Sequence, residues 1–272
     1  MKPIAKPYPV QRCLGMIALL AATAFMLMPI AIVIPVSFTP NRYLSMPGAD
    51  WSGRHYHTLF TAPAWLESAG DSILIALISG AIATLLALGF GLGLWYWRTR
   101  HARWLIGLVL LPMIVPPIVS AVMIYFLEAR LGAIDTYPGL ILAHVIMIVP
   151  YATVTILIAL LHVDRRLEMA GRNAGANTWQ ITWKIILPNI RFGVLSAYFL
   201  AVVLSWEEVV VTLFISGIDI ITLPKRIWDG LRLSVDPIIA AVSVILIAVT
   251  LLAILVRTLR VMPRAARTAA AT

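Results

Sequence analysis

Six long apolar runs restrict the fold of this chain more than any other feature of its sequence. Each covers 20 or more residues, enough for a helix to cross a bilayer core of about 30 Å, and only the fifth contains charged residues, Glu207 and Glu208. The runs cover residues 13–41, 72–97, 104–127, 136–163, 192–218 and 237–256. We therefore predict an all-α, polytopic membrane protein in which residues 1–272 form a single transmembrane domain. Its six helices are expected at about residues 14–37, 72–97, 104–127, 138–161, 193–215 and 238–257.

The composition agrees with this class and excludes two others. Of the 272 residues, 61% are hydrophobic and 12% are charged, and the mean hydropathy is +0.94. A soluble domain carries roughly 25% charged residues, so a water-soluble enzyme is excluded. A disordered chain needs low hydrophobicity and high net charge, so disorder is excluded as well.

The positive charges indicate how the chain crosses the membrane. Of the 21 Lys and Arg residues, 15 lie in the N-terminal segment, the second and fourth loops and the C-terminal tail, and 6 lie in the other three loops. Because cytoplasmic loops carry the excess of positive charge, both termini are predicted to be cytoplasmic. The net charge of +9 therefore reports orientation, and nucleic acid is not an expected partner.

The first apolar run follows Lys2, Lys6 and Arg12, as the core of a signal peptide would. It is too long for one and no small-residue cleavage site follows, so we interpret it as a retained anchor. The single cysteine, Cys13, has no partner for a disulfide, and the five histidines lack the spacing of metal ligands. We expect no metal and no other cofactor.

Two runs contain residues that affect helix packing. Gly89 and Gly93 form a GxxxG spacing, which predicts close approach of a neighbouring helix. Pro112, Pro116 and Pro117 predict irregular backbone in the third run. Such backbone either lines a transport path or forms a kink without a function, and the sequence favours neither.

Glu207 and Glu208 are the costliest residues to place in a bilayer. Glu207 follows Phe192 by 15 residues, or about 22 Å of helix, which places it in the outer half of the membrane. Adjacent residues of a helix point about 100° apart, so we expect only one acid to face a central path and no catalytic pair. The favoured interpretation is a cation-attracting wall; the alternative is a position at the outer interface or an ion pair with Arg226 or Arg232.

The polar loop over residues 163–191 is patterned. Residues 164–174 are expected to form a short helix that ends at Gly175. Asn177 and Gln180 then resemble a capping box at the start of a second helix. Trp179, Trp183 and Ile186 have the spacing of one apolar stripe, and Leu187-Pro188 is expected to end that helix. The tryptophans either enter a groove on a partner or lie at the membrane interface.

This loop resembles the EAA loop of ABC-importer permeases, whose pattern is EAA, three residues, Gly, nine residues, Ile, any residue, Leu-Pro. The matching segments are residues 167–180, LEMAGRNAGANTWQ, and 184–188, KIILP. The departure is at the EAA itself, which reads Met169-Ala-Gly171, with Glu168 one place earlier. By this resemblance, the residues expected to couple to an ATPase are Glu168, Met169, Ala170, Gly171, Gly175, Trp179, Trp183, Leu187 and Pro188.

Further segments are similar to permeases of the spermidine/putrescine subgroup: residues 204–217, 222–230, 111–116 and 142–144. The resemblance implies a type I ABC-importer permease fold in the bacterial cytoplasmic (inner) membrane, without enzymatic activity of its own. It also implies a second permease subunit, two ATPase subunits and a periplasmic substrate-binding protein as partners. For a polyamine such as putrescine or spermidine, the expected path residues are Glu207, Glu208, Trp206 and Tyr125. The alternatives are an ABC permease for another small organic solute and a secondary transporter.

Overall fold

The structure is a computed structural model that describes residues 9–97, 99–233 and 235–269. Lys2, Lys6 and Arg98, which contribute to the predicted charge pattern, lie outside these residues, and so do the side chains of Arg12 and Cys13. The described residues form helices, turns and loops and contain no strand. In chain order the helices are α1 (Pro9–Val36), α2 (Arg54–Thr61), α3 (Pro63–Trp97), α4 (Ala102–Ile114), α5 (Pro117–Leu131), α6 (Tyr137–Leu161), α7 (Arg165–Asn173), α8 (Thr178–Ile181), the π-helix η1 (Thr182–Ile186), α9 (Leu187–Glu207), α10 (Val210–Ile215), α11 (Leu223–Leu233) and α12 (Ile238–Ala269).

The helix lengths confirm the predicted all-α membrane fold. Within the described residues, five helices are long and apolar enough to cross a membrane. They are α1, α3, α6, the continuous helix Thr178–Glu207, and α12. A sixth span results if α4 and α5, which meet at a bend of 100°, are counted as one.

The bend between α4 and α5 follows from the proline pair in the third apolar run. Val115 and Pro116 each precede a proline, and their ψ angles of 135° and 133° are extended. A following proline disfavours the helical conformation, which explains why α4 ends here. Pro117 then occupies the first turn of α5, where its missing N–H costs nothing. The predicted irregular backbone is therefore confined to two residues, while Pro112 stays within α4.

The chain divides into two compact units, Met1–Pro63 with Asp229–Thr272, and Ala64–Trp228. In the first unit α12 contacts α1 and α2. The loop after α1 is held by aromatic packing, with the Phe38 ring 5.2 Å from that of Tyr56 and 5.9 Å from that of Trp51.

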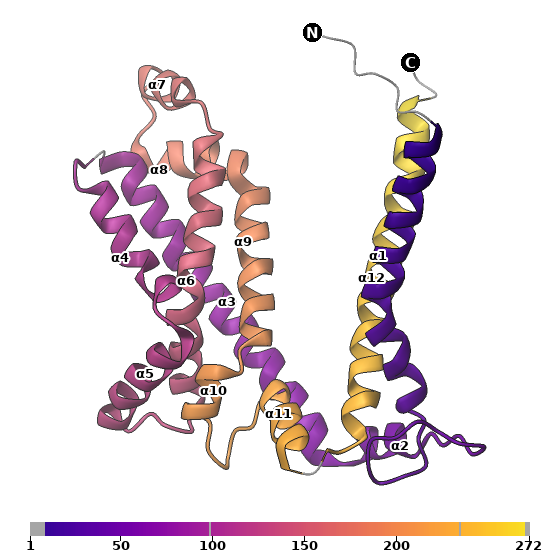
Figure 1. Ribbon diagram of the computed structural model, residues 1–272. Coiled ribbons are helices and arrows are strands. Elements are labelled where there is room, and N and C mark those ends of the chain that lie inside the picture. The colour runs from indigo at the N-terminus through magenta and orange to yellow at the C-terminus, as the bar shows by residue number, and fades with distance from the viewer. Residues whose placement is uncertain (1–8, 98, 234, 270–272) are drawn as a thin grey trace. The chain divides into compact units, whose positions relative to one another are not determined.

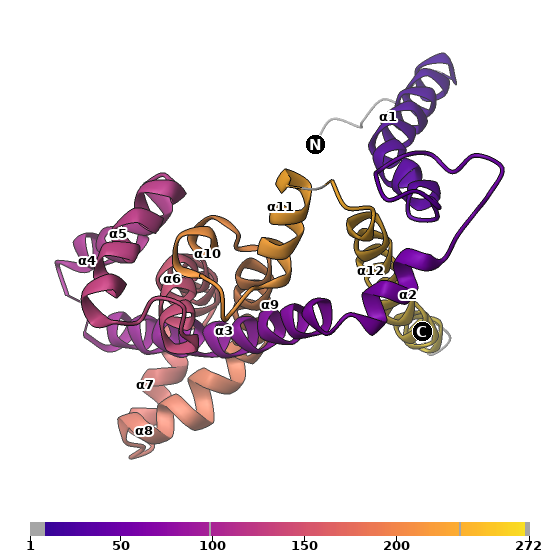
Figure 2. The ribbon, with the colours of Figure 1, turned by 90° about the horizontal axis from the view of Figure 1, so that it is seen from below.

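The second unit is a bundle in which α6 packs against α9 and α4, and α10 packs against α5 and α6. Figure 1 shows α7 and α8 at one end of this bundle and α5 and α10 at the other, and Figure 2 shows the same helices from below. The residues expected to contact an ATPase and those expected to contact substrate therefore lie toward opposite ends of one unit.

Close helix approach in this bundle occurs at glycines other than the predicted pair. A Cβ at Gly80 would lie 2.7 Å from Val202 Cγ2 of α9, and one at Gly91 would lie 2.9 Å from Ile156 Cγ2 of α6. At Gly89 and Gly93 a Cβ would meet nothing within 4 Å. The predicted GxxxG contact is therefore wrong for the packing of this chain, because the face of α3 that meets α6 and α9 contains Gly80 and Gly91.

Candidate functional site

The two glutamates of the fifth apolar run lie where the helix breaks. α9 ends at Glu207, Glu208 has extended backbone (φ −71°, ψ 112°), and α10 begins at Val210. The expectation that the acids occupy adjacent positions of one continuous helix is therefore wrong. The break is stabilised by Glu208 itself, whose Oε1 accepts a hydrogen bond from the Val211 N–H over 2.9 Å. This bond satisfies a backbone donor that the start of a helix otherwise leaves free.

The break also separates the roles of the two acids. Glu208 is half-buried and its carboxylate is committed to α10. Glu207 is exposed, and in the described part of the chain its side chain forms no hydrogen bond or ion pair. Arg226, one of the two predicted pairing partners, instead donates from Nε to Ser68 Oγ over 2.6 Å. Of the two acids, Glu207 is thus the one available to a ligand.

A buried histidine holds the two sides of this break together. The side chain of His144 on α6 is 1% exposed. Its Nδ1 lies 2.8 Å from Ser205 Oγ on α9, and its Nε2 lies 3.1 Å from Thr212 Oγ1 on α10. Both ring nitrogens and both hydroxyls are therefore partnered in a place where an unpartnered polar group would be costly. The fixed end of α9 is the platform from which Glu207 projects.

The other predicted path residues lie on separate helices. Trp206 is half-buried beside Glu207 at the end of α9. Tyr125 lies on α5, is 38% exposed, and packs edge-on against Phe126 with ring centroids 5.8 Å apart. Within the described residues, no hydrogen bond or ring contact joins Tyr125 to Trp206 or to either glutamate. Three of the four predicted path residues are thus adjacent in the chain at the end of α9, while Tyr125 lies on α5, which packs against α10.

Asp135, in the loop between α5 and α6, fixes the segment that follows α10. Its carboxylate accepts hydrogen bonds from the backbone N–H groups of residues 217–220 over 2.7–3.2 Å. Its own N–H donates to Ile215 O over 3.0 Å. Partial burial raises the pKa of Asp135, but the four backbone donors outweigh it and hold the pKa below the ordinary value. The loop after α10 is therefore clamped by a single carboxylate.

At the opposite end of the bundle, α7 and α8 confirm the predicted helix–glycine–helix pattern. Asp164 caps α7 by accepting a hydrogen bond from the Arg166 N–H over 2.8 Å. Gly175 has φ +81°, a conformation that favours glycine. Asn177 and Gln180 form the expected reciprocal capping box, with bonds of 2.8 and 3.0 Å. The loop is thus defined by local hydrogen bonds before any partner is considered.

The helix does not end at Leu187-Pro188 as expected. Pro188 has no N–H to donate to a regular helical hydrogen bond. The residues before it form the π-helix η1, after which the Leu187 N–H bonds to Thr182 O, and the helix continues beyond the proline. Asn189 adds a bond from Nδ2 to Ile185 O over 2.6 Å. α8, η1 and α9 therefore form one continuous helix from the loop to Glu207, a rigid connection between the two ends of the bundle.

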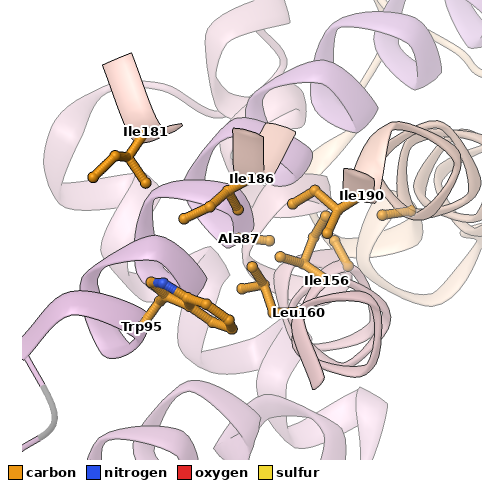
Figure 3. Close-up of a cluster of buried hydrophobic side chains, with 9 residues drawn as sticks. Ala87, Trp95, Ile156, Leu160, Ile181, Ile186 and Ile190 are labelled. Atoms are coloured by element: carbon orange, nitrogen blue, oxygen red, sulfur yellow. The ribbon is translucent and has the colours of Figure 1, made fainter. Parts of the chain in front are cut away.

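The π turn also divides the predicted apolar stripe. Trp179 and Trp183 are 69% and 51% exposed, with ring centroids 5.2 Å apart, whereas Ile186 is 1% exposed. The first three buried residues of this helix are Ile181, Ile186 and Ile190. The spacing of five between Ile181 and Ile186 matches the wider π turn. Figure 3 shows Ile186 and Ile190 packed among residues of α3 and α6, namely Ala87, Ile156 and Leu160. Trp179 and Trp183 lie outside this cluster.

Glu168 faces the bundle and not the solvent. Its Oε2 accepts a hydrogen bond from the Trp95 Nε1–H over 2.9 Å, and its Oε1 accepts two bonds from Arg172 over 2.9 and 3.1 Å. Arg165 lies with Cζ 3.3 Å from the centre of the Trp95 ring and donates to Trp95 O over 2.7 Å. Burial raises the pKa of Glu168, but the bonds from Arg172 and Trp95 outweigh it and lower the pKa on balance.

The remaining EAA positions differ in exposure. Met169, at the place of the EAA glutamate, is 56% exposed, and Ala170 is exposed as well. Gly171 is buried, and a Cβ there would lie 2.9 Å from Ile185 Cδ1. Its lack of a side chain lets α7 lie directly on η1. Leu187 and Pro188 begin α9, and Leu187 packs against the cluster of Figure 3.

Sequence reasoning missed four residues of these two regions: Trp95, Arg165, His144 and Asp135. His144 and Asp135 had one visible signal, a polar side chain within or beside an apolar run, where burial demands a partner. Trp95 and Arg165 are unremarkable at a cytoplasmic helix end. Their contact joins positions 70 residues apart and is visible only in the fold.

Comparisons with known proteins agree with this arrangement. The family model of the binding-protein-dependent transport system inner membrane component matches residues 83–262. The spermidine/putrescine transport system permease protein PotC of Haemophilus influenzae is 33% identical over 221 residues, which cover 81% of this chain and 85% of that protein. The putrescine transport system permease protein PotI of Escherichia coli is 28% identical over 240 residues, which cover 84% of this chain and 83% of that protein.

A solved structure supports the fold. A chain from the crystal structure of a bacterial ABC transporter involved in the import of the acidic polysaccharide alginate aligns with a TM-score of 0.65. The alignment covers 94% of this chain and 99% of that chain at 16% identity, so it concerns the fold alone. The predicted ABC-importer permease fold and the inner-membrane location are confirmed. The chain belongs to the family of binding-protein-dependent transport system inner membrane components, the permease subunits of ABC importers.

Proposed function

We propose that this chain forms half of the translocation path of an ATP-driven importer for a polyamine such as putrescine or spermidine. Both units would belong to one transmembrane permease domain that pairs with a second permease subunit. Two ATPase subunits and a periplasmic substrate-binding protein complete the importer. The observation that carries the proposal is an exposed, unpaired carboxylate, Glu207, at a helix break within an apolar segment of a permease.

The substrate class follows from the chemistry at this break. A carboxylate in a membrane segment is costly unless it faces water or a cation, so Glu207 is suited to a cationic solute. Trp206, next to it, can add a cation–π contact of about 0.5–2 kcal/mol. The relatives named for spermidine and putrescine support the same class. A single weak anionic contact also suits transport, because the solute must leave again.

The proposed coupling runs through residues 163–191. Met169, Trp179 and Trp183 present exposed apolar surface on a loop that hydrogen bonds already hold in one conformation. This loop would dock into a cleft of the ATPase, and the continuous helix from Thr178 to Glu207 would carry the movement to the substrate end. The EAA pattern has a glutamate where this chain has Met169, and the neighbouring Glu168 is hydrogen-bonded to Trp95. The proposed docking face is therefore apolar at this position.

The proposed orientation is supported by the charge pattern, which predicts that both termini and the loop over residues 163–191 are cytoplasmic. In this orientation the break at Glu207 lies toward the periplasm, where the binding protein delivers substrate. The arrangement allows alternating access by rigid-body motion of the bundle.

The test is uptake of labelled putrescine into proteoliposomes that contain this chain, its partner permease and its ATPase, with binding protein outside and ATP inside. The variant Trp179→Ala/Trp183→Ala should lose most ATP-dependent uptake and release the ATPase during purification. Trp97→Ala removes another exposed tryptophan, 84% exposed and outside the loop, and should behave as wild type. Full uptake by the double variant, or uptake driven by an ion gradient without ATP, would refute the proposed coupling.

A further inference from the structure

The turn between α3 and α4 carries two arginines without a counter-charge. Arg100 and Arg103 are exposed, and in the part of the chain that the structure describes neither side chain forms a hydrogen bond or an ion pair. Elsewhere in that part, Arg165 and Arg172 each form an ion pair with Glu168. The positive charge of this turn is therefore free to attract an anion.

These arginines border a groove on one face of α4. The groove has a volume of about 490 Å³ and is lined by Arg100, Arg103, Trp104 and Gly107. Residues 103 and 107 lie one turn apart on the helix surface. A Cβ at Gly107 would meet nothing within 4 Å, so the glycine leaves a bare strip of backbone below the arginines. Trp104, 82% exposed, forms an aromatic wall beside it.

The surroundings place this groove at the membrane interface. Trp97 and Trp104 are 84% and 82% exposed on the two sides of the turn, and exposed tryptophans are typical of the headgroup region. Beyond Trp104 the exposed residues of α4 include Leu105, Leu108 and Leu111, which suit contact with lipid tails. The arginines therefore lie at the depth of lipid phosphates, with apolar surface directly adjacent.

A second opening, on the other side of α4, does not fit a phosphate. This crevice of about 450 Å³ is lined mostly by apolar residues such as Leu94, Ile106 and Leu157. Its arginine, Arg165, is already bound to Trp95 and Glu168. Of these two openings beside α4, the one with Arg100 and Arg103 combines free positive charge with an open apolar strip.

We propose that the groove on α4 binds an anionic phospholipid, with the phosphate between Arg100 and Arg103 and an acyl chain along Gly107 and Trp104. A lipid fits better than a soluble anion because the groove continues into the apolar surface of α4. The cytoplasmic leaflet, to which the orientation proposed above assigns this turn, is the anionic one in many membranes. The bound lipid would fix the α3–α4 turn next to the base of the coupling loop.

The test is native mass spectrometry of the assembled importer titrated with dioleoyl phosphatidylglycerol, and with dioleoyl phosphatidylcholine for comparison. Because each basic residue at an anionic surface contributes about a factor of five, Arg100→Gln/Arg103→Gln should weaken phosphatidylglycerol binding roughly thirtyfold. Gly107→Leu keeps both charges, fills the bare strip, and should also reduce binding. Arg166→Gln/Lys184→Gln removes two exposed charges of the coupling loop and should leave binding unchanged.

Three outcomes would overturn the proposal. They are equal binding of both lipids by the wild-type importer, unchanged phosphatidylglycerol binding in both groove variants, and an equal loss in the loop control, which would indicate diffuse charge attraction. If the double arginine variant does not assemble, Gly107→Leu still decides. Lipid binding is measured without transport, so its failure leaves the proposed uptake function standing, and failed polyamine uptake leaves the lipid site standing.

Discussion

The indole N–H of Trp95 donates a hydrogen bond of 2.9 Å to Glu168 Oε2 and so joins the last turn of α3 to α7, 73 residues further along the chain. The acid nearest to the EAA position is thereby turned inward, where its side chain is 13% exposed. Arg165 stacks on the same indole ring. Trp95 on α3 thus contacts both Glu168 and Arg165 of α7 and fastens the loop proposed to meet the ATPase to the membrane bundle.

Replacing Trp95 with phenylalanine should loosen this attachment. The variant keeps an aromatic ring but removes the donor, and a hydrogen bond to a charged group contributes about 1.5–3 kcal/mol. Amide hydrogen exchange within α7 should accelerate, and ATP hydrolysis should become less tightly coupled to uptake. Trp97→Phe, at the neighbouring exposed tryptophan, should change neither quantity. Unchanged α7 protection in Trp95→Phe would contradict the attachment.

The same attachment should depend on pH. Because the pKa of Glu168 is lowered below its ordinary value of 4.5, the ionised form stabilises the folded loop. This contribution is fully present above pH 4.5 and is lost as the pH falls through the lowered pKa. Hydrogen exchange of α7, corrected for the intrinsic pH dependence of exchange, should therefore rise only as the pH falls below 4.5. Glu168→Gln should abolish the dependence; a similar acid response in that variant would assign it to another group.

Asp135→Asn should release the loop that follows α10. Asparagine tolerates the positive φ of 58° at this position, so the change mainly removes the negative charge and one acceptor oxygen. The amides of residues 217–220 should lose protection equivalent to about 1–3 kcal/mol. Asp219→Asn, at an exposed acid of the same loop, serves as the control. Equal protection in the two variants would show that the clamp is not needed.

Gly175→Ala should destabilise the junction of α7 and α8 through backbone strain alone. A Cβ there meets nothing within 4 Å, but φ is +81°, which costs a side-chain-bearing residue about 1–2 kcal/mol. Binding of the purified permease to its ATPase should weaken measurably. Gly89→Ala adds a methyl group at a helical glycine that is also open, and should bind as wild type. Wild-type ATPase binding by both variants would remove Gly175 from the coupling residues.

The fold could be predicted from sequence wherever one local rule decided the outcome. Run length located the apolar segments, and the prolines at positions 116 and 117 indicated irregular backbone. The single helix expected at about residues 104–127 is nevertheless two helices, α4 and α5, with a bend of 100° between them. The capping pair Asn177 and Gln180 defined the start of α8. Where two rules competed, sequence reasoning failed. Pro188 was expected to end a helix. Instead, a π turn before it buries both Ile181 and Ile186, five residues apart, and the helix continues.

For the candidate site, the sequence singled out residues but did not predict their geometry. The free-energy cost of placing an acid in a membrane singled out Glu207 and Glu208. It did not predict that Glu208 caps a new helix and leaves Glu207 free. The break is also bridged by His144, which comes from another helix and bonds on both sides of it. Contacts between helices that are distant in sequence depend on which helix faces meet. The sequence of α3 does not determine its contact face, because glycines lie on several of its faces.

The most direct test of the proposed function compares Glu207→Gln with Glu67→Gln in ATP-driven uptake of labelled putrescine and spermidine. Glu67 is an exposed acid of α3 whose side chain forms no hydrogen bond or ion pair with the described residues, so it controls for the loss of one negative charge. We predict that Glu207→Gln assembles normally but loses at least tenfold in uptake, equivalent to about 1.4 kcal/mol, while Glu67→Gln transports as wild type. Wild-type uptake by Glu207→Gln, or an equal loss in both variants, would contradict a substrate contact at Glu207.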